Sequence, residues 1–282
     1  MNPTIAIVAQ GAMGAGVGAR LAARGLRVVT SLAGRSDASA KRAEAAGMAV
    51  VSDQECAQAD FFLSICPPSE AMALAQKMAA QITLSAPNSK KPIYVDCNAV
   101  SPQSKVAIGE VILKTGAPFV DVGIIGLPPK EGTSPFLHAS GPEAAKFGVL
   151  NDFGITVNVI DGPVGAASAL KMSYAGITKG ISALGSMMML AATRAGVAEM
   201  LRGELDRSHP AFITNFQRAI PDMFDKAYRF DGEMKEIADF VGEDPQARQM
   251  YQAISEFYTR IAADHAGKRA ETGALAAFLK KK

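Results

Sequence analysis

The sequence predicts an α/β domain with a doubly wound parallel sheet, followed by an all-helical C-terminal domain. Two observations support this fold class. Over residues 1–162, short apolar runs alternate with helical stretches of about 10–15 residues, the pattern of βαβ units with right-handed crossovers. Beyond this range strand patterns stop, and long stretches rich in Ala, Gly and Met follow. We therefore expect a sheet domain over residues 1–162 and a helical domain over residues 163–282.

Each expected strand is a short apolar run that ends at a turn. These runs are, in chain order, residues 4–9, 26–32, 48–51, 60–65, 92–96, 118–124 and 155–160. The first two helices cover residues 12–24, closed by Gly25, and residues 36–46, closed by Gly47, because glycine commonly ends a helix. Short strands that are apolar throughout are typical of a sheet covered by helices on both faces.

The second half consists of helices separated by breaks at "SHP" (208–210) and "GEDP" (242–245). The expected helices cover, approximately, residues 164–195, 210–228, 231–241 and 245–265. Helices with so much Ala, Gly and Met allow close packing, either within the domain or against a second copy. We expect a homodimer formed through the helical domain.

Composition and charge exclude several classes of function. The net charge is +2 and both signs are scattered along the chain, so neither a nucleic-acid footprint nor a basic membrane patch is present. The longest apolar span, "GISALGSMMMLAA", is shorter than the roughly 20 residues that cross a bilayer. Three cysteines without metal-ligand spacing and three histidines make a zinc site unexpected. We expect a cytoplasmic protein with reduced thiols and no metal, nucleic-acid or membrane partner.

The turn after the first strand, "AQGAMGAGVG" (9–18), indicates a Rossmann-type dinucleotide site. Gly11 and Gly14 match the last two glycines of the G-x-G-x-x-G pattern, whereas Ala9 replaces the first. At this place the backbone N–H groups of a helix N-terminus would meet the pyrophosphate. A glycine-rich turn without a ligand is the alternative. The strand before it and the helix after it favour a cofactor site formed by Gly11, Ala12, Met13 and Gly14.

The end of the second strand, "TSLAGRS", bears on which dinucleotide binds. An NAD site usually has an acidic residue here for the ribose 2′-OH, but no acid occurs before Asp37. Arg35 and Ser36 offer a fork-shaped cation and a hydroxyl that suit the 2′-phosphate of NADP. Alternatively, Ser36 only caps the next helix and Arg35 is solvated. We expect NADP as the preferred cofactor, with NAD possible.

These motifs resemble those of the 3-hydroxyisobutyrate/6-phosphogluconate dehydrogenase superfamily, the β-hydroxyacid dehydrogenases, over nearly the whole chain. The counterparts occur in the family's order: "AQGAMG" (9–14), "GRS" (34–36), "CP" (66–67), "DCNAVSP" (96–102), "DVGIIG" (121–126) and "GPVGAASALKM" (162–172). Residues 228–240 look like the signature of a subgroup with a divergent helical domain. The resemblance implies a dinucleotide-dependent dehydrogenase with a small-molecule substrate.

The resemblance also implies the residues that surround the cofactor and substrate. Cys66, Pro67 and Asn98 correspond to strand ends beside the nicotinamide. The serine with which the family grips its substrate is replaced by Ile125, whereas the glycine after it is kept as Gly126. An apolar side chain at this wall implies a bulkier or less polar substrate than a short hydroxy acid.

Lys171 lies in the apolar stretch "ALKMSYAGITKG" (169–180) and corresponds to the family's catalytic lysine. A lysine can take the hydroxyl proton as the hydride leaves, provided that burial and a positive nicotinamide lower its pKa. A solvated lysine is the alternative. The family's asparagine four residues later is Ala175 here, but Tyr174 lies one turn after Lys171 on the same face. Tyr174 then either assists the chemistry or packs in the core.

The sequence thus predicts an NADP-preferring oxidoreductase acting on a hydroxy acid or its keto or aldehyde counterpart. An imine reductase is the nearest alternative, although those enzymes usually lack the lysine at the position of Lys171. A dinucleotide-binding protein without catalytic activity is a third possibility, because Ile125 and Ala175 depart from the family pattern.

Overall fold

The computed structural model describes residues 2–86 and 90–280. The chain divides into two compact units, Met1–Met172 and Ser173–Lys282. The division lies inside a long helix, α7 (Ala166–Arg194), whereas the sequence predicted it at residue 162. The start of α7 stays with the first unit because it packs on the sheet there. A Cβ atom added to Gly123 would lie 2.6 Å from the carbonyl oxygen of Ala167.

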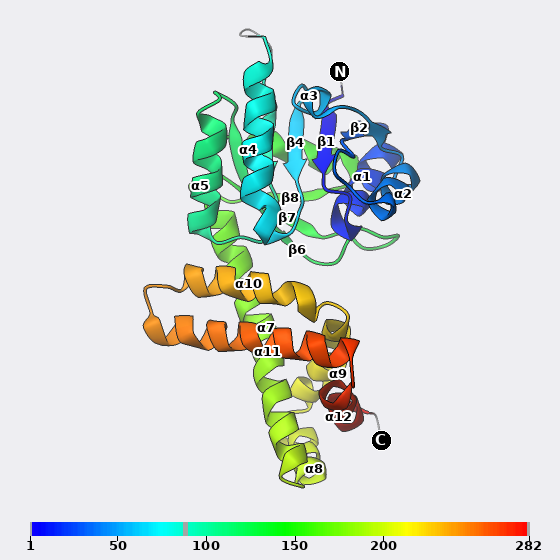
Figure 1. Ribbon diagram of the computed structural model, residues 1–282, viewed down its shortest axis with the longest axis vertical. Helices are drawn as coiled ribbons and strands as arrows, with labels where there is room; N and C mark the ends of the chain where they lie inside the picture. The colour runs from blue at the N-terminus through cyan, green and yellow to red at the C-terminus, as the bar shows by residue number, and fades with distance from the viewer. Residues whose placement is uncertain (1, 87–89, 281–282) are drawn as a thin grey trace. The chain divides into compact units, whose positions relative to one another are not determined.

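The first unit is built on a sheet with the strand order β3-β2-β1-β4-β5-β6-β7-β8 in the described residues (Figure 1). The strands are β1 (Thr4–Val8), β2 (Arg27–Thr30), β3 (Ala49–Val50), β4 (Phe61–Ser64), β5 (Ile93–Asp96), β6 (Phe119–Ile125), β7 (Phe136–Ser140) and β8 (Thr156–Val159). Strands β1 to β6 run parallel to one another. The predicted fold class, a Rossmann-type sheet followed by helices, is confirmed.

One strand corrects the prediction of a parallel sheet. Strand β7 is antiparallel to β6, with Asp121 opposite Ser140 and Ile125 opposite Phe136, and the sheet is therefore mixed. The segment "FLHAS" has no continuous apolar run, and Phe136 is exposed. It becomes a strand because it pairs with β6, and a local sequence pattern does not carry that information.

Helices cover the sheet, and some of them begin at a serine whose side chain accepts a hydrogen bond from the first turn. Those of the first unit are α1 (Ala12–Ala23), α2 (Asp37–Ala45), α3 (Asp53–Cys56), α4 (Pro68–Leu84), α5 (Pro102–Leu113), α6 (Ala144–Phe147) and a 3₁₀ helix (Gly148–Phe153). Ser101 caps α5 by accepting a hydrogen bond from the Ser104 N–H at 3.2 Å. Helices α4 and α5 lie side by side on the sheet (Figure 1). Alternate residues of each strand face opposite sides, so Ile5 and Ala6 enter two different apolar cores.

The second unit contains the rest of α7 and five further helices in the described residues. They are α8 (Ala198–Ser208), α9 (Pro210–Phe224), α10 (Ala227–Phe240), α11 (Pro245–Ala266) and α12 (Ala270–Leu279). Helices α8 and α12 were not predicted. Arg202 of α8 donates to the Phe278 carbonyl of α12 at 2.9 Å, and Asp264 of α11 accepts from the Ala270 and Thr272 N–H groups at 2.8 Å. The contact of Arg202 with Phe278 joins α8 to α12 across a long distance in sequence, whereas Asp264 caps the start of α12 locally.

Helix α7 lies within the predicted range 164–195, but its apolar character extends beyond the span "GISALGSMMMLAA". Among the described residues it is the one helix that is long and apolar enough to cross a membrane, judged by length and composition only. The central helix of a packed protein meets the same two criteria, and residues of α7 are buried in each unit.

Candidate active site

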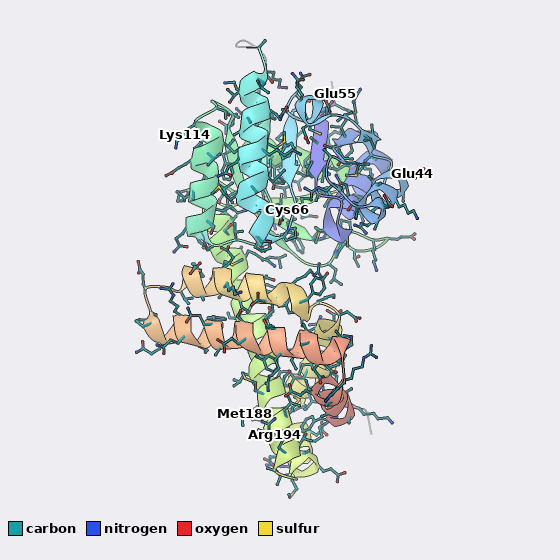
Figure 2. All side chains as sticks on the ribbon, viewed as in Figure 1. Glu44, Glu55, Cys66, Lys114, Met188 and Arg194 are labelled. Atoms are coloured by element: carbon teal, nitrogen blue, oxygen red, sulfur yellow. The ribbon has the colours of Figure 1, made fainter. Side chains whose placement is uncertain are left out.

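The predicted cofactor residues meet at one edge of the sheet. Because β1, β2, β4, β5 and β6 are parallel, their carboxyl ends lie on the same side. Gly11 follows β1, Arg35 follows β2, Cys66 follows β4 and Asn98 follows β5, while Ile125 ends β6. The strand order reverses direction between β1 and β4, and ligands of doubly wound sheets bind at such a switch point. Figure 2 shows Cys66 just beyond the end of β4.

The turn after β1 has the geometry that a dinucleotide needs. A Cβ atom at Gly14 would overlap the carbonyl oxygen of Ala9, so glycine is required where α1 crosses the turn. A Cβ atom at Gly11 would meet nothing within 4 Å among the described residues. The space beside this glycine is therefore open. No side chain of the described residues caps α1, which begins at Ala12 and has no acid in its first turn. The backbone N–H groups of Ala12, Met13 and Gly14, at the start of α1, therefore suit an anion.

Gln10, which the sequence analysis did not select, holds this turn in place. Its fully buried side chain donates to the Ser31 carbonyl at 3.1 Å and to the Thr30 hydroxyl. The Gln10 carbonyl accepts a hydrogen bond from Arg42 Nε at 2.6 Å. The turn after β1 and the end of β2 are therefore joined by polar contacts. The signal for Gln10 was present, because a polar residue replaces the family's leucine within the glycine-rich turn.

The residues predicted to select NADP, Arg35 and Ser36, lie between the end of β2 and the start of α2. Arg35 is half-buried and Ser36 is exposed. Ser36 Oγ accepts a hydrogen bond from the Ser39 N–H at 3.4 Å, so the prediction that Ser36 caps α2 is confirmed. Arg42 Nη2 donates to Ser39 Oγ at 3.2 Å. Arg42 and Ser39 therefore lie near the start of α2 together with the predicted pair, Arg35 and Ser36.

Asn98 connects the ends of β4 and β5 through a buried amide. Its Nδ2 donates to Ser64 Oγ at 2.8 Å and to Asp96 Oδ2 at 2.9 Å, while its Oδ1 accepts from the Cys66 N–H at 2.6 Å. Both amide hydrogens are therefore used inside the protein. The contact of Asn98 with a cofactor remains a prediction, but its side chain has no hydrogen left to donate. Burial raises the pKa of the neighbouring Cys66 thiol to about 11, so this thiol is a poor nucleophile at neutral pH.

A fully buried lysine, Lys105 of α5, contacts the end of β5. Its Nζ donates to the Asp96 carbonyl at 2.7 Å, forms an ion pair with the Asp96 carboxylate, and lies 3.6 Å from Asp121 Oδ1. Burial lowers the pKa of Lys105, but the charges of Asp96 and Asp121 outweigh it and raise that pKa above its usual value. Lys105 could not be predicted as a buried residue, because nothing in the local sequence distinguishes it from a solvated helix lysine.

Asp121 of β6 caps the helix that carries Lys171. Its Oδ2 accepts hydrogen bonds from the Gly165 N–H at 2.9 Å and the Ser168 N–H at 3.0 Å, and its Oδ1 accepts from Ser168 Oγ at 2.7 Å. Ser140 Oγ donates to the same carboxylate at 3.1 Å. A carboxylate at a helix N-terminus is also favoured by the helix dipole. The first turn of α7 is thereby fixed to the sheet, one turn before Lys171.

Helix α7 lies close against β6 at Lys171. A Cβ atom at Gly123 would lie 2.9 Å from Lys171 Cβ, so glycine at this position allows α7 to approach the strand. Lys171 is half-buried, so it is neither as buried as the predicted acid/base lysine nor as exposed as the alternative, a solvated lysine. Ile125 lies two residues after Gly123 and so faces the same side of the sheet as Lys171. The structure therefore brings the predicted acid/base residue and the predicted apolar wall to one face of β6.

Gly126 follows β6, and Tyr174 lies on α7. Gly126 has a φ of +126°, and a Cβ atom there would lie 3.0 Å from Pro135 Cα, so glycine is required by both backbone and space. Tyr174 follows Lys171 by one turn of α7 and belongs to the second unit. It is 49% exposed, so the interpretation of Tyr174 as a core aromatic is wrong.

Comparison with known families agrees with this arrangement. Residues 4–148 match the family described as the NAD binding domain of 6-phosphogluconate dehydrogenase, and residues 192–261 match DUF1932, a domain of unknown function. The chain is 29% identical, over 219 residues, to an uncharacterized 28.5 kDa protein from the 7S RNA 5′ region of Methanothermus fervidus. That match covers 77% of this chain and 82% of the relative.

Solved structures share the fold over nearly the full chain. The conserved protein MTH1747, of unknown function and reported to be structurally similar to 3-hydroxyacid dehydrogenases, is 28% identical with a TM-score of 0.70, covering 92% of this chain and 97% of its own. The 3-hydroxyisobutyrate dehydrogenase of Mycobacterium tuberculosis has a TM-score of 0.72 at 19% identity, covering 94% and 96%. The chain therefore belongs to the family defined by the NAD-binding domain of 6-phosphogluconate dehydrogenase, here followed by a DUF1932 domain.

Proposed function

We propose that this protein is an NADP-preferring oxidoreductase that transfers a hydride between the nicotinamide and a hydroxy acid, or its keto or aldehyde counterpart. The observation that carries the proposal is that the start of α7 is hydrogen-bonded to β6. Asp121 fixes this helix to β6 through the Gly165 and Ser168 N–H groups, which sets Lys171 over the same strand as Ile125. A solvated helix lysine needs no such anchoring.

Lys171 is the general acid/base in this proposal. The nicotinamide, when bound, supplies or accepts the hydride. Lys171 Nζ takes the proton of the substrate hydroxyl in the oxidative direction and returns it in the reductive direction. Tyr174 lies one turn later on the same helix and is exposed, and in this proposal its hydroxyl donates to a substrate oxygen.

The residues around the turn after β1 would hold the cofactor. The open space at Gly11 and the first N–H groups of α1 suit the pyrophosphate. Arg35 and Ser36 would bind the 2′-phosphate, because a guanidinium and a hydroxyl both donate to a dianion. Cys66 and Pro67 follow β4 beside this turn, where they would border the nicotinamide.

Ile125 determines the kind of substrate that we expect. A serine hydroxyl at this wall would bind a polar group, whereas the isoleucine side chain can only make apolar contact. The substrate is therefore bulkier or less polar than a short hydroxy acid. A preference for 3-hydroxyisobutyrate over larger hydroxy acids would contradict this part of the proposal.

A substrate panel tests the function directly. Hydroxy acids, keto acids and cyclic imines of graded size are assayed with NADPH or NADP⁺ and with NADH or NAD⁺, following absorbance of the reduced nicotinamide. We expect turnover of a hydroxy-acid/keto-acid pair, faster with the phosphorylated cofactor. Turnover of cyclic imines alone would assign an imine reductase instead. Tight NADPH binding without turnover of any panel member would assign a binding protein without catalytic activity.

A further inference from the structure

Lys105 joins two parts of the candidate active site that are far apart in the sequence. Its ammonium group contacts the carboxylates of Asp96 and Asp121, which are direct neighbours across β5 and β6. All three side chains are fully buried. Two buried carboxylates at neighbouring positions repel each other, and a cation beside both allows them to stay ionised together. The lysine therefore permits a charged hydrogen-bond acceptor on each of the two strands.

The first carboxylate, Asp96, orients the turn that follows β5. Its Oδ1 accepts a hydrogen bond from the Asn98 N–H at 3.0 Å, and its Oδ2 accepts from Asn98 Nδ2 at 2.9 Å. Lys105 Nζ donates to the Asn98 carbonyl at 3.2 Å. One carboxylate and one ammonium group thus hold both the backbone and the amide of Asn98. Because Asn98 Oδ1 accepts from the Cys66 N–H, the residues after β4 are fixed through the same turn.

The second carboxylate, Asp121, fixes the start of α7. It accepts hydrogen bonds from the backbone of Gly165 and Ser168, one turn before Lys171. Lys105 therefore lies between the carboxylate that orients Asn98 and the carboxylate that fixes the helix of Lys171. Stability alone does not require such a cluster, because well-packed apolar residues often replace a buried ion pair without loss. The charged groups instead supply acceptors at two defined places.

We propose that Lys105 is a positioning residue that holds the turn at Asn98 and the start of α7 in a fixed arrangement. This rests on the proposed function, in which Cys66 borders the nicotinamide and Lys171 transfers the proton. In the oxidative direction the hydride leaves a carbon of the substrate and the proton leaves the oxygen bound to that carbon. The nicotinamide and the Lys171 amine must therefore be placed together, since an error of about 1 Å can cost about 10²-fold in rate. Lys105 is fully buried and acts through the two carboxylates.

Two variants separate positioning from stability. Lys105→Met removes the ammonium group and leaves two carboxylates that repel each other. Adding Asp96→Asn removes this repulsion, and Asp121 keeps its hydrogen bonds to the start of α7. However, an asparagine side chain has one acceptor oxygen where Asp96 uses two, and the donor to the Asn98 carbonyl is still absent. The double variant should therefore regain stability and an ordered start of α7, while the turn at Asn98 remains loose.

Ile82→Ala is the matched control for loss of stability. Ile82 is buried in the last turn of α4, which begins at Pro68, just after Cys66. It lies about 21 Å further along the helix. Truncation of a buried isoleucine also destabilises a unit substantially. This variant therefore loses stability at the end of α4 that is remote from Cys66.

Hydrogen exchange read by mass spectrometry follows both segments without any substrate, at a temperature where each variant is folded by circular dichroism. In Lys105→Met, amide exchange should become faster by about tenfold or more in peptides covering residues 97–101 and 165–169, relative to the rest of the first unit. The double variant should keep fast exchange only at residues 97–101, and Ile82→Ala should show it in neither peptide. Unchanged exchange at residues 97–101 in both lysine variants would overturn the proposal.

Steady-state kinetics with the best substrate of the panel provide the second measurement. Both lysine variants should have kcat lowered by about 10–100-fold. Their NADPH affinity should stay within about threefold of wild type, because the phosphates bind at the turn after β1 and the end of β2. The pH profile should keep the limb due to Lys171, which is still present. Ile82→Ala should keep a kcat within about twofold of wild type.

The single variant Asp96→Asn identifies the contribution of the lysine. Here Lys105 still donates to the Asn98 carbonyl and pairs with Asp121, so kcat should be higher than in the double variant. Equal kcat values for these two variants would overturn the proposal, as would wild-type kcat in the double variant, because Lys105 would then serve stability alone. If the wild type turns over no substrate of the panel, the proposed function is refuted, while the exchange pattern still decides whether Lys105 holds both segments.

Discussion

Replacement of Lys105 by methionine should strongly destabilise the first unit. The substitution keeps the length and the apolar contacts of the side chain but leaves Asp96 and Asp121 as two buried carboxylates without their cation. Removing one partner of a buried ion pair typically costs about 3–5 kcal/mol. For a unit of this size each kcal/mol corresponds to about 2–4 °C, so the melting temperature should fall by about 6–20 °C.

The contacts of the two carboxylates indicate where this loss arises. Asp121 keeps donors from Ser140, Gly165 and Ser168, whereas Asp96 keeps only the two from Asn98 among the described residues. The loss should therefore come mainly from Asp96. Adding Asp96→Asn to Lys105→Met restores the original net charge of the cluster and should recover more than half of the stability.

Urea and thermal unfolding followed by circular dichroism measure these effects. Lys114→Met is the matched control, because Lys114 follows the same helix but is exposed, and it should change stability by no more than about 0.5 kcal/mol. The reasoning is refuted if Lys105→Met unfolds within about 1 kcal/mol of the wild type. It is also refuted if the double variant is no more stable than the single one.

The dependence on pH provides an independent check. Although burial lowers the pKa of Lys105, the two carboxylates raise it further, so the folded-state pKa exceeds the usual value of 10.5. A raised pKa means that the stabilisation is fully present below pH 10.5 and is lost as the pH rises through the folded-state value. The difference in stability between wild type and Lys105→Met should thus be constant near neutrality and narrow in strong alkali.

Three further predictions concern the candidate site. Lys171→Met should lower kcat by about 10²–10⁴-fold with NADPH affinity unchanged, since only the proton-transferring group is removed; wild-type turnover would contradict this role. Arg35→Ala should weaken NADPH binding, measured by titration, by about 1.5–3 kcal/mol and leave NADH binding unchanged; an equal loss for both would argue against a 2′-phosphate contact. Because burial raises the pKa of Cys66 to about 11, iodoacetamide should modify it slowly at pH 7 and faster as the pH approaches that value, with NADPH protecting it. Mass spectrometry of the Cys66 peptide would reveal rapid labelling at neutral pH if this is wrong.

The sequence by itself determined the elements whose reasons are local. Continuous apolar runs predicted β1 and β4 because a strand covered on both faces needs apolar residues at every position. Gly11 and Gly14 located the cofactor turn, since they follow a strand and precede a helix, and Ser36 marked the start of α2. Lys171 stood out because a lysine is unexpected in so apolar a stretch.

Only the tertiary structure decided which polar groups are buried together. Asp96, Lys105 and Asp121 come from two strands and a helix, and each alone resembles a surface residue. Strand β7 exists because it pairs with β6, a contact between segments that no local pattern describes. Asn98 was predicted at the right strand end, but its amide is used to join β4 to β5. Which side chains are buried, and which groups they contact, depends on residues distant along the chain. These contacts form only when the strands assemble.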